Sequence, residues 1–333
     1  MNENRVRIVD IAEALGVSTA TVSNVIHGKT KKISDETVKR VQELLEEKKY
    51  IPSMAELLLA QNDSRIIGVV VNDHKKYENH VLEDIFISSS LNYLSDEIKK
   101  AGYFMMVKTT RELEEIARFA SMWNMEGLIA IGFCDEYKNL KNFLHIPFVV
   151  YDGFVKKQER LCNLIVDNYD GGYKIGQYFY NMGHRKVLCI SDNDICGDLE
   201  RYKGFSAAMK EGRADFMLIP MEKEERNLFY KEKLEELKEY SAIFAVSDYY
   251  AIDLMHFLRE NEIIVPNDIS VAGFDDCPLC EMVYPTLTTI RQDGRKRAEL
   301  AVEMIKKLKN ENDSGTTVTL PVTLIERQSV KRI

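Results

Sequence analysis

A short segment near the start of the chain carries side chains suited to reading DNA bases. They are small or polar and repeat at helical spacing: Thr19, Ala20, Ser23, Asn24 and His27. Asparagine can pair with adenine in the major groove, and hydroxyl groups can bond to several base edges. Val22 and Val25 fall on the opposite side of the same segment. A helical hairpin with solvated polar residues fits this pattern too, so the spacing alone leaves both interpretations open.

Three short helices are predicted to position this polar face. Residues 8–15 carry apolar side chains at helical spacing, Gly16 can adopt a left-handed turn, and Ser18 can cap a second helix over residues 19–26. Apolar residues at helical spacing over 38–45 predict a third helix. The order of helix, turn and helix predicts a helix-turn-helix unit.

Side chains near these helices are candidates for phosphate contacts, which set register without reading sequence. They are basic or carry hydroxyl groups: Arg7, Ser18, Thr21, Ser23, Lys29, Thr30, Lys31, Lys32 and Tyr50. Residues 1–60 contain equal numbers of acidic and basic side chains, and the net charge of the whole chain is −8. Nonspecific affinity for DNA is therefore expected to be weak.

Beyond residue 60, short apolar runs alternate with amphipathic helical segments, as in βαβ units with a parallel sheet. This alternation restarts after residue 166, which predicts two similar α/β lobes. Residues 72–83 and 220–227 are expected to be surface loops. The predicted strands are 66–71, 103–107, 128–131, 186–190 and 242–246. The predicted helices are 91–100, 112–123, 173–181, 204–210 and 250–261.

The six cysteines are sparse, and we expect reduced thiols. Cys277 and Cys280 have CxxC spacing, but no second such pair or nearby histidine pair completes a zinc motif. They are interpreted as incidental loop thiols, and no metal or cofactor is expected. No apolar stretch approaches the roughly 20 residues that cross a bilayer, and no secretory signal is visible. We therefore expect a soluble cytoplasmic protein without a membrane partner.

Residues 8–28 and 33–41 resemble the DNA-binding head of the lactose-repressor (LacI/GalR) family, and residues 50–53 resemble its end. Landmarks similar to that family continue through the chain at 67–71, 127–129, 146–150, 166–168, 183–187, 201–205, 273–276 and 288–292. The resemblance implies an α/β fold with an N-terminal helix-turn-helix head and a two-lobed core like the periplasmic binding proteins, built of parallel sheets flanked by helices.

The resemblance also implies the domain limits. The head spans 1–52, a hinge helix and linker span 53–63, and an effector-binding core spans 64–333. Lobe 1 would hold 64–165 and 292–320, and lobe 2 would hold 166–291 and 321–333, with three crossings between them. Members of the family bind near-palindromic operator DNA as homodimers. Because no leucine heptad follows Arg327, a dimer is expected here.

Two departures from the family concern DNA. Asn24 stands where arginine is common, so an operator of different sequence is expected, since arginine prefers guanine. In the predicted hinge, Leu59 occupies the place of the leucine that enters the minor groove in the family, but Glu56 replaces a common alanine. Packing between hinges, or between hinge and core, is an equally favoured role for the hinge leucines.

Transferred singly, the family's effector-binding positions fall on residues predicted to line a cleft between the lobes: Asp73, Asp84, Phe86, Arg201, Ser247, Asp248 and Asp275. Carboxylates, a guanidinium and an aromatic face suit a polyhydroxylated ring, so a sugar or sugar derivative is the leading interpretation. An ion pair between Arg201 and Asp275 is the alternative for those two. His74 and His80 are expected to be solvated.

The resemblance implies a transcriptional regulator, with repression as the leading interpretation, whose operator affinity changes when an effector fills the core. An enzyme is not expected, since no GxSxG, Walker-type loop or GxGxxG motif occurs. The remaining alternatives are a core that responds to a partner protein or to a non-sugar corepressor, and a cytoplasmic small-molecule-binding protein.

Overall fold

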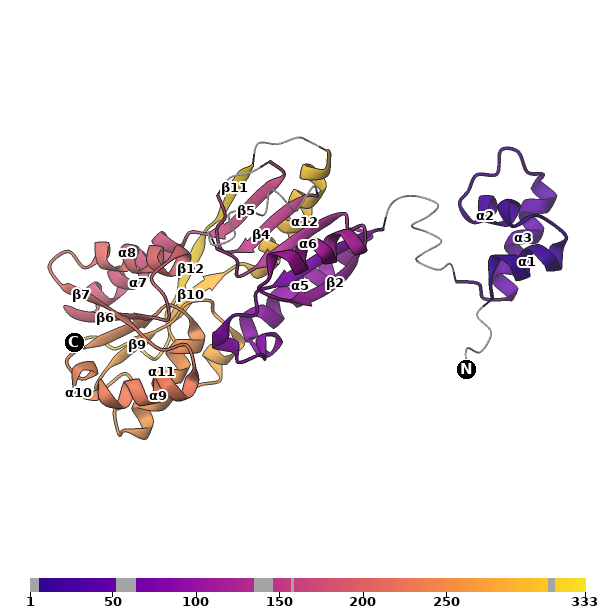
Figure 1. Cartoon of the computed structure of the whole chain (residues 1–333). Coiled ribbons are helices and arrows are strands. Elements are labelled where there is room, and N and C mark those ends of the chain that lie inside the picture. The colour runs from indigo at the N-terminus through magenta and orange to yellow at the C-terminus, as the bar shows by residue number, and fades with distance from the viewer. Residues whose placement is uncertain (1–5, 52–63, 135–145, 157–158, 311–314) are drawn as a thin grey trace. The chain divides into compact units, whose positions relative to one another are not determined.

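The computed structural model describes residues 6–51, 64–134, 146–156, 159–310 and 315–333. The chain folds as two units that divide after Ser64 (Figure 1). The first unit contains α1 (Ile8–Leu15), α2 (Thr19–Ile26) and α3 (Asp35–Glu47). The predicted hinge at 53–63, including Leu59, lies outside the described residues.

The helix-turn-helix prediction is confirmed, because α1 and α2 have the expected bounds. Gly16 ends α1 in the left-handed conformation, with φ of 66°. Ser18 then caps α2, since its Oγ accepts a hydrogen bond from the Thr21 backbone at 3.1 Å. Over residues 6–51 the core of this unit is small and contains five buried side chains: Ile11, Ala12, Val22, Val25 and Val41.

Lobe 1 of the second unit is built on a parallel sheet, which among the described residues has six strands in the order β11-β5-β4-β3-β1-β2. Their bounds are β1 (Ile66–Val71), β2 (Phe104–Thr109), β3 (Gly127–Ile131), β4 (Phe148–Asp152), β5 (Leu161–Val166) and β11 (Thr316–Leu320).

Side chains alternate across this sheet and bury both of its faces. Val69 packs in the same cluster as Leu94 of α5 (Ile85–Lys100) and Ile305 of α12 (Gly294–Asn310). Val70 packs in the opposite cluster with Ile116 of α6 (Leu113–Met122). Burial on both faces explains the continuous apolar runs of these strands.

Lobe 2 contains a second parallel sheet, with the strand order β7-β6-β8-β9 in the described part of the chain. Its strands are β6 (Lys186–Ser191), β7 (Arg213–Leu218), β8 (Ala242–Ala245) and β9 (Ser270–Ala272). Its helices are α7 (Asn168–Asn181), α8 (Cys196–Ala208), α9 (Lys223–Glu232), α10 (Leu234–Leu237) and α11 (Asp248–Glu260).

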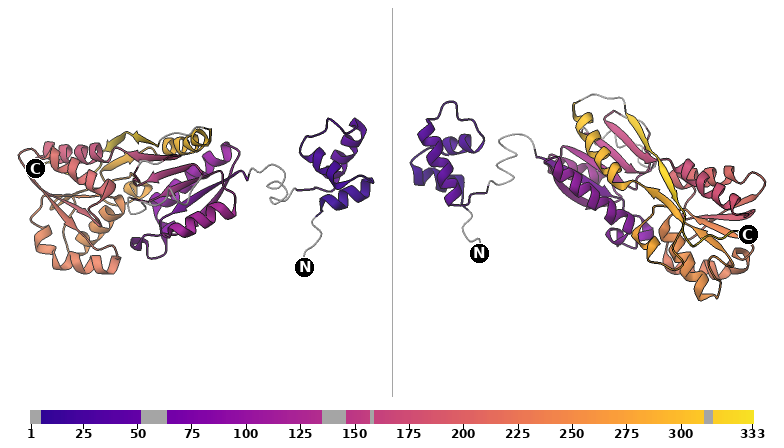
Figure 2. Two further views of the ribbon diagram at one scale, coloured as in Figure 1. Left: turned by 45° about the horizontal axis from the view of Figure 1, so that its top comes forward. Right: turned by 180° about the vertical axis from the view of Figure 1, so that it is seen from behind.

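In the part of the chain that the structure describes, the backbone passes between the lobes three times. The first crossing follows β5, the second joins β10 (Thr289–Gln292) to α12, and the third joins β11 to β12 (Val322–Ile325). β10 and β12 pair antiparallel, so two crossings lie side by side at the junction of the lobes (Figure 2). The carboxyl ends of several strands meet at this junction, which is where open α/β sheets bind ligands.

The loop prediction for 220–227 is wrong in part, and the one for 72–83 holds except where the segment packs inward. Residues 223–232 form α9, and Arg226 within it is fully buried because its guanidinium pairs with Asp253 at 2.7 Å. Residues 72–83 contain two 3-10 turns, Lys75–Tyr77 and Val81–Glu83, and they bury Val81. Paired charge and tertiary packing thus override the polar composition of both segments. Among the described residues, no helix is both long and apolar enough to span a bilayer.

Candidate functional site

The α2 helix presents the polar face expected from the sequence. Thr19, Ala20 and Asn24 are exposed, and Ser23 and His27 are partly exposed. Val22 and Val25 are buried beneath them, as predicted. The side chain of Asn24 has no hydrogen-bond partner among the described residues, so its amide is available to a ligand. The structure therefore holds four candidate base-reading side chains on α2 and a fifth, His27, at its C-terminal cap.

The candidate phosphate contacts differ in how free they are. Lys29 and Lys31 are exposed. Arg7 is exposed but pairs with Asp10 at 3.1 Å, and the hydrogen bond with Asp10 raises the pKa of the guanidinium. The hydroxyls of Ser18 and Thr21 bond to each other at 2.9 Å while the first caps α2.

Of three other candidates, two are less exposed and one lies outside the described residues. Ser23 and Tyr50 are half-buried. Leu59 lies outside the described residues. The free lysines are thus the clearest cationic contacts that the head offers.

A second polar cluster lies at the junction of the lobes, and Arg201 on α8 is central to it. Its guanidinium donates to Asn168 Oδ1 at 2.8 Å and to the Val246 carbonyl at 2.6 Å, and it stacks 3.8 Å from the ring centroid of Phe274. Its Nη1 also lies 3.4 Å from Asp198. Within the described residues Nη2 donates to no group, so a fixed donor remains available.

Asp275 is close enough to Arg201 for the two charges to interact. Burial raises the pKa of its carboxyl well above the usual range; the charge of Arg201 opposes this shift, while Asp248, Asp152 and Asp84 add to it. Oδ1 accepts a hydrogen bond from Gln292 at 2.6 Å. No ion pair within 4.0 Å joins Arg201 to Asp275 in the described ranges, so the alternative of an ion pair is not what the structure shows.

A chain of polar contacts connects Asp275 to lobe 1. Gln292 accepts a hydrogen bond from Arg297 Nη1 at 2.9 Å, and Arg297 Nη2 lies 3.4 Å from Asp152 Oδ1. Arg297 is 2% exposed. Since Asp152 ends β4 and Arg297 belongs to α12, this network joins both lobes through the crossing segment at Gln292.

Ser247 and Asp248 have structural partners. Ser247 Oγ caps α11 by accepting from the Tyr250 backbone at 3.4 Å. Asp248 is 1% exposed, and both of its carboxylate oxygens are engaged: Oδ1 accepts from the Thr289 hydroxyl at 2.5 Å and Oδ2 from the Cys277 backbone at 2.8 Å. The carboxylate of Asp248 is thus committed to holding the start of α11.

The lobe 1 candidates follow the sheet edge. Asp73 comes just after β1, and its Oδ1 is buried without a hydrogen-bond partner among the described residues. Asp84 caps α5 by accepting from the Ile87 backbone at 3.0 Å, and Phe86 packs half-buried in the first turn of that helix. An unsatisfied buried acceptor is costly, which makes Asp73 Oδ1 a candidate ligand contact.

Sequence reasoning missed three groups at this junction. Asp152 is the last residue of β4 and Asp192 directly follows β6, so position at a strand's carboxyl end was the available signal. Lys76 lies in the segment expected to be a surface loop. Burial opposes its charge, but Tyr77, Asp192 and other acidic groups outweigh burial and raise the pKa of the amine well above the usual range. Lys76 therefore lies in the electrostatic field of lobe 2.

The segment 72–83 also contacts lobe 2 directly. Glu78 Oε1 accepts a hydrogen bond from the backbone N–H of Lys223, the first residue of α9, at 3.2 Å. His80 is exposed as expected and bonds to Glu83 at 3.2 Å, whereas His74 is partly buried, contrary to expectation. The length of this segment is what lets it reach the second lobe.

The fold and these two clusters define a DNA-binding type of head joined to a two-lobed core of the periplasmic-binding type. Residues 7–53 match the model of bacterial regulatory proteins of the lacI family, and residues 177–330 match the periplasmic binding protein-like domain. The chain belongs to the lacI family of bacterial regulatory proteins. It is a DNA-binding transcriptional regulator.

Similar proteins cover most of the chain. The HTH-type transcriptional repressor PurR of Vibrio atlanticus (strain LGP32) is 28% identical over 98% of this chain and 99% of its own. The lac repressor dimer bound to operator and the anti-inducer ONPF has a similar fold, with a TM-score of 0.83, 22% identity, and coverage of 98% and 100%. A LacI-type regulator from Alkaliphilus metalliredigens QYMF complexed with D-xylulofuranose is 25% identical, with a TM-score of 0.67 and coverage of 80% and 99%.

Proposed function

We propose that the protein is a repressor that binds a near-palindromic operator as a homodimer, and that a small effector between the lobes of the core sets its affinity for that operator. The leading effector class is a sugar or sugar derivative. The proposal is supported by a relative named as a repressor and by similar proteins solved with operator or with a sugar.

One observation carries the DNA-binding part: α2 exposes Asn24, Thr19 and Ala20 while Val22 and Val25 lock its other face into the core. Asparagine reads adenine through two hydrogen bonds, and a rigid helix holds the register of those bonds. Two copies related by a two-fold axis would present two such helices to successive turns of the duplex. Lys29 and Lys31 would contribute phosphate contacts around each of them.

The effector part rests on hydrogen-bonding groups that remain available at the junction of the lobes. Arg201 offers Nη2 as a donor, and Asp275 and Asp73 offer acceptors. Paired donors and acceptors of this kind match vicinal hydroxyl groups, which both donate and accept. In this proposal Asp84, Ser247 and Asp248 shape the site by holding helix starts, and Phe86 supplies an aromatic face.

Coupling follows from the arrangement of the lobes. An effector that bonds to both lobes stabilises one relative position of them, and only such differential binding can shift the equilibrium. A coupling free energy of about 1–3 kcal/mol changes operator affinity about 5- to 150-fold. The direction of that change distinguishes induction from corepression.

The operator half of the proposal is tested by selecting duplexes from a random pool with the full chain. We expect inverted half-sites whose centres lie about 10 base pairs, or a multiple of that, apart. Asn24→Ala should weaken binding to the selected site about 5- to 150-fold and leave nonspecific binding unchanged.

The matched control is Lys29→Ala, which should weaken binding to all duplexes alike and reduce the salt dependence. Sedimentation of the full chain supplies the oligomeric state. A monomeric chain, or an equal loss on every duplex for Asn24→Ala, would contradict the proposal.

The effector half is tested by a thermal-shift screen of sugars and purines on the full chain. A ligand present at about 100 times its dissociation constant should add about 2.7 kcal/mol to stability. Each hit is then tested for its effect on operator affinity. A purine hit without any sugar hit would contradict the carbohydrate assignment, and a hit that leaves operator affinity unchanged would contradict the coupling.

A further inference from the structure

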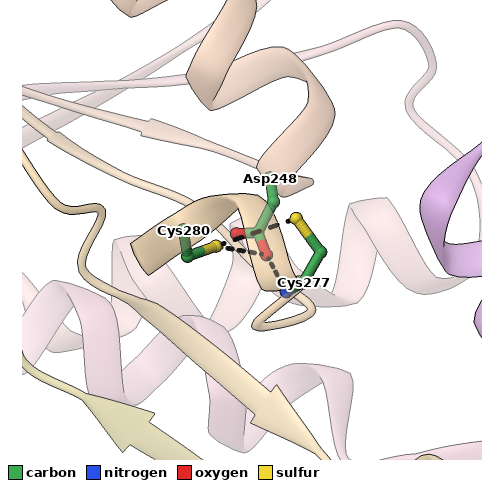
Figure 3. A group of neighbouring side chains, drawn as sticks. All are labelled: Asp248, Cys277 and Cys280. Atoms are coloured by element: carbon green, nitrogen blue, oxygen red, sulfur yellow. Dashed lines mark hydrogen bonds between the residues drawn. The ribbon is translucent and has the colours of Figure 1, made fainter. Parts of the chain in front are cut away.

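Three side chains with metal-binding atoms converge in lobe 2, and two of them, the cysteines, have no role in the proposed function. Asp248 begins α11. Cys277 directly precedes the 3-10 turn Pro278–Glu281, which follows β9 and contains Cys280 (Figure 3). One ligand atom from each residue lies within 4.8 Å of the other two. CxxC spacing brings the two thiols together locally, and the fold adds a carboxylate from a helix about thirty residues earlier.

We propose that Asp248, Cys277 and Cys280 form a binding site for a divalent zinc ion, with three protein ligands and a fourth position open to water. Zinc binds thiolate and carboxylate ligands in tetrahedral geometry. The site offers two thiols and one carboxylate. The inference goes beyond the proposed function, which assigns neither cysteine a role.

Two of the three distances between ligand atoms are close to those of a tetrahedral site. The two Sγ atoms are 3.9 Å apart. Zinc–sulfur bonds of about 2.3 Å at the tetrahedral angle separate two sulfurs by about 3.8 Å. Cys280 Sγ lies 3.0 Å from Asp248 Oδ2, because its thiol donates a hydrogen bond there. With a zinc–oxygen bond of about 2.0 Å that separation becomes about 3.5 Å, so Cys280 Sγ and Asp248 Oδ2 must move apart by about half an ångström to admit the ion. The third pair, Cys277 Sγ and the Asp248 carboxylate, lies within 4.8 Å.

The surroundings already orient the carboxylate. Thr289 donates to its Oδ1 and the Cys277 backbone to its Oδ2, which are the outer contacts that hold a metal-ligating carboxylate in place. On binding, each thiol loses its proton to solvent and each sulfur forms one bond to zinc, so two protons are released per ion. The hydrogen bond from Cys280 to Asp248 is replaced by the two bonds to the metal.

Both cysteines are free thiols, so neither sulfur is committed to a disulfide. A bound ion would connect the start of α11 to the turn that holds Asp275.

The test uses the full chain, reduced with a phosphine and freed of metal, and titrated with Co²⁺. We expect one ion per chain, with thiolate-to-cobalt charge-transfer absorption, the intense visible bands of tetrahedral cobalt, and loss of both when Zn²⁺ is added. Cys277→Ser and Cys280→Ser should each weaken binding at least tenfold. Cys134→Ser, which alters a half-buried thiol of lobe 1, should leave binding unchanged.

Circular dichroism confirms that each variant is folded, and Cys277→Ser alters the half-buried member of the pair, so it tolerates exchange best. Absence of charge-transfer absorption, a pale octahedral spectrum, or loss of binding in Cys134→Ser would overturn the proposal. So would re-formation of a Cys277–Cys280 disulfide in the presence of the ion. None of these outcomes bears on the operator and effector tests.

Discussion

Replacing Asp275 by asparagine should separate stability from ligand binding. Asparagine has nearly the same shape and can still accept the hydrogen bond that Gln292 donates to Oδ1 at 2.6 Å. The change removes a buried charge whose pKa is raised by burial, with Asp248 and other carboxyls adding to the effect. We therefore expect the variant to be as stable as the parent at neutral pH or more stable, by on the order of 1 kcal/mol.

The pH dependence of stability provides a second test of whether Asp275→Asn stabilises the protein. A carboxyl with a raised pKa in the folded state holds its proton more tightly there than in the unfolded chain. Its contribution to stability is therefore greatest at acid pH and is lost as pH rises from the unfolded pKa through the raised folded pKa. The stability of Asp275→Asn relative to the parent should rise across that window and stay level above it, as measured by urea unfolding at several pH values.

The affinity for the ligand, unlike the stability, should decrease in Asp275→Asn. A net hydrogen bond between a ligand hydroxyl and this carboxyl contributes about 0.5–3 kcal/mol, so its loss weakens affinity about 2- to 150-fold. The assay is calorimetric titration with the sugar found in the screen. The control is Asp276→Asn, whose carboxylate pairs with Arg327 at 2.7 Å and Arg291 at 2.5 Å; it should lower stability. A destabilised Asp275→Asn with unchanged affinity would refute the reasoning.

Three further predictions concern packing and the contact between the lobes. Gly172→Ala should lower stability by about 1–3 kcal/mol in thermal unfolding, because its Cβ would lie 1.8 Å from the Arg201 carbonyl oxygen where α7 crosses α8. Glu78→Ala should weaken the inter-lobe contact with Lys223 by about 0.5–1.5 kcal/mol and broaden inter-lobe distances measured by fluorescence transfer, whereas Glu78→Gln retains an acceptor and should change them less. Val22→Ala should lower the free energy of unfolding of the head by about 2 kcal/mol. Calorimetry should then show a lower melting temperature for the head and an unchanged one for the two-lobed core.

Much of the fold is encoded locally. The bounds of α1 and α2 follow from apolar spacing, the turn residue Gly16 and the cap Ser18, all of which act over a few residues. The buried strands were visible as apolar runs for the same reason. Helix starts were less visible, since α5 begins at Ile85 and α8 at Cys196, ahead of the predicted segments.

The sequence by itself determined the two-unit plan, the polar face of α2 and the alternation of strands and helices, because short-range spacing controls each of them. Only the tertiary structure decided which distant groups meet. It buried Arg226 against Asp253, placed Lys76 in the field of lobe 2, and brought Asp248 to Cys277. Such pairings depend on how elements pack across the fold, and no local pattern records which partner a charged or thiol group will find.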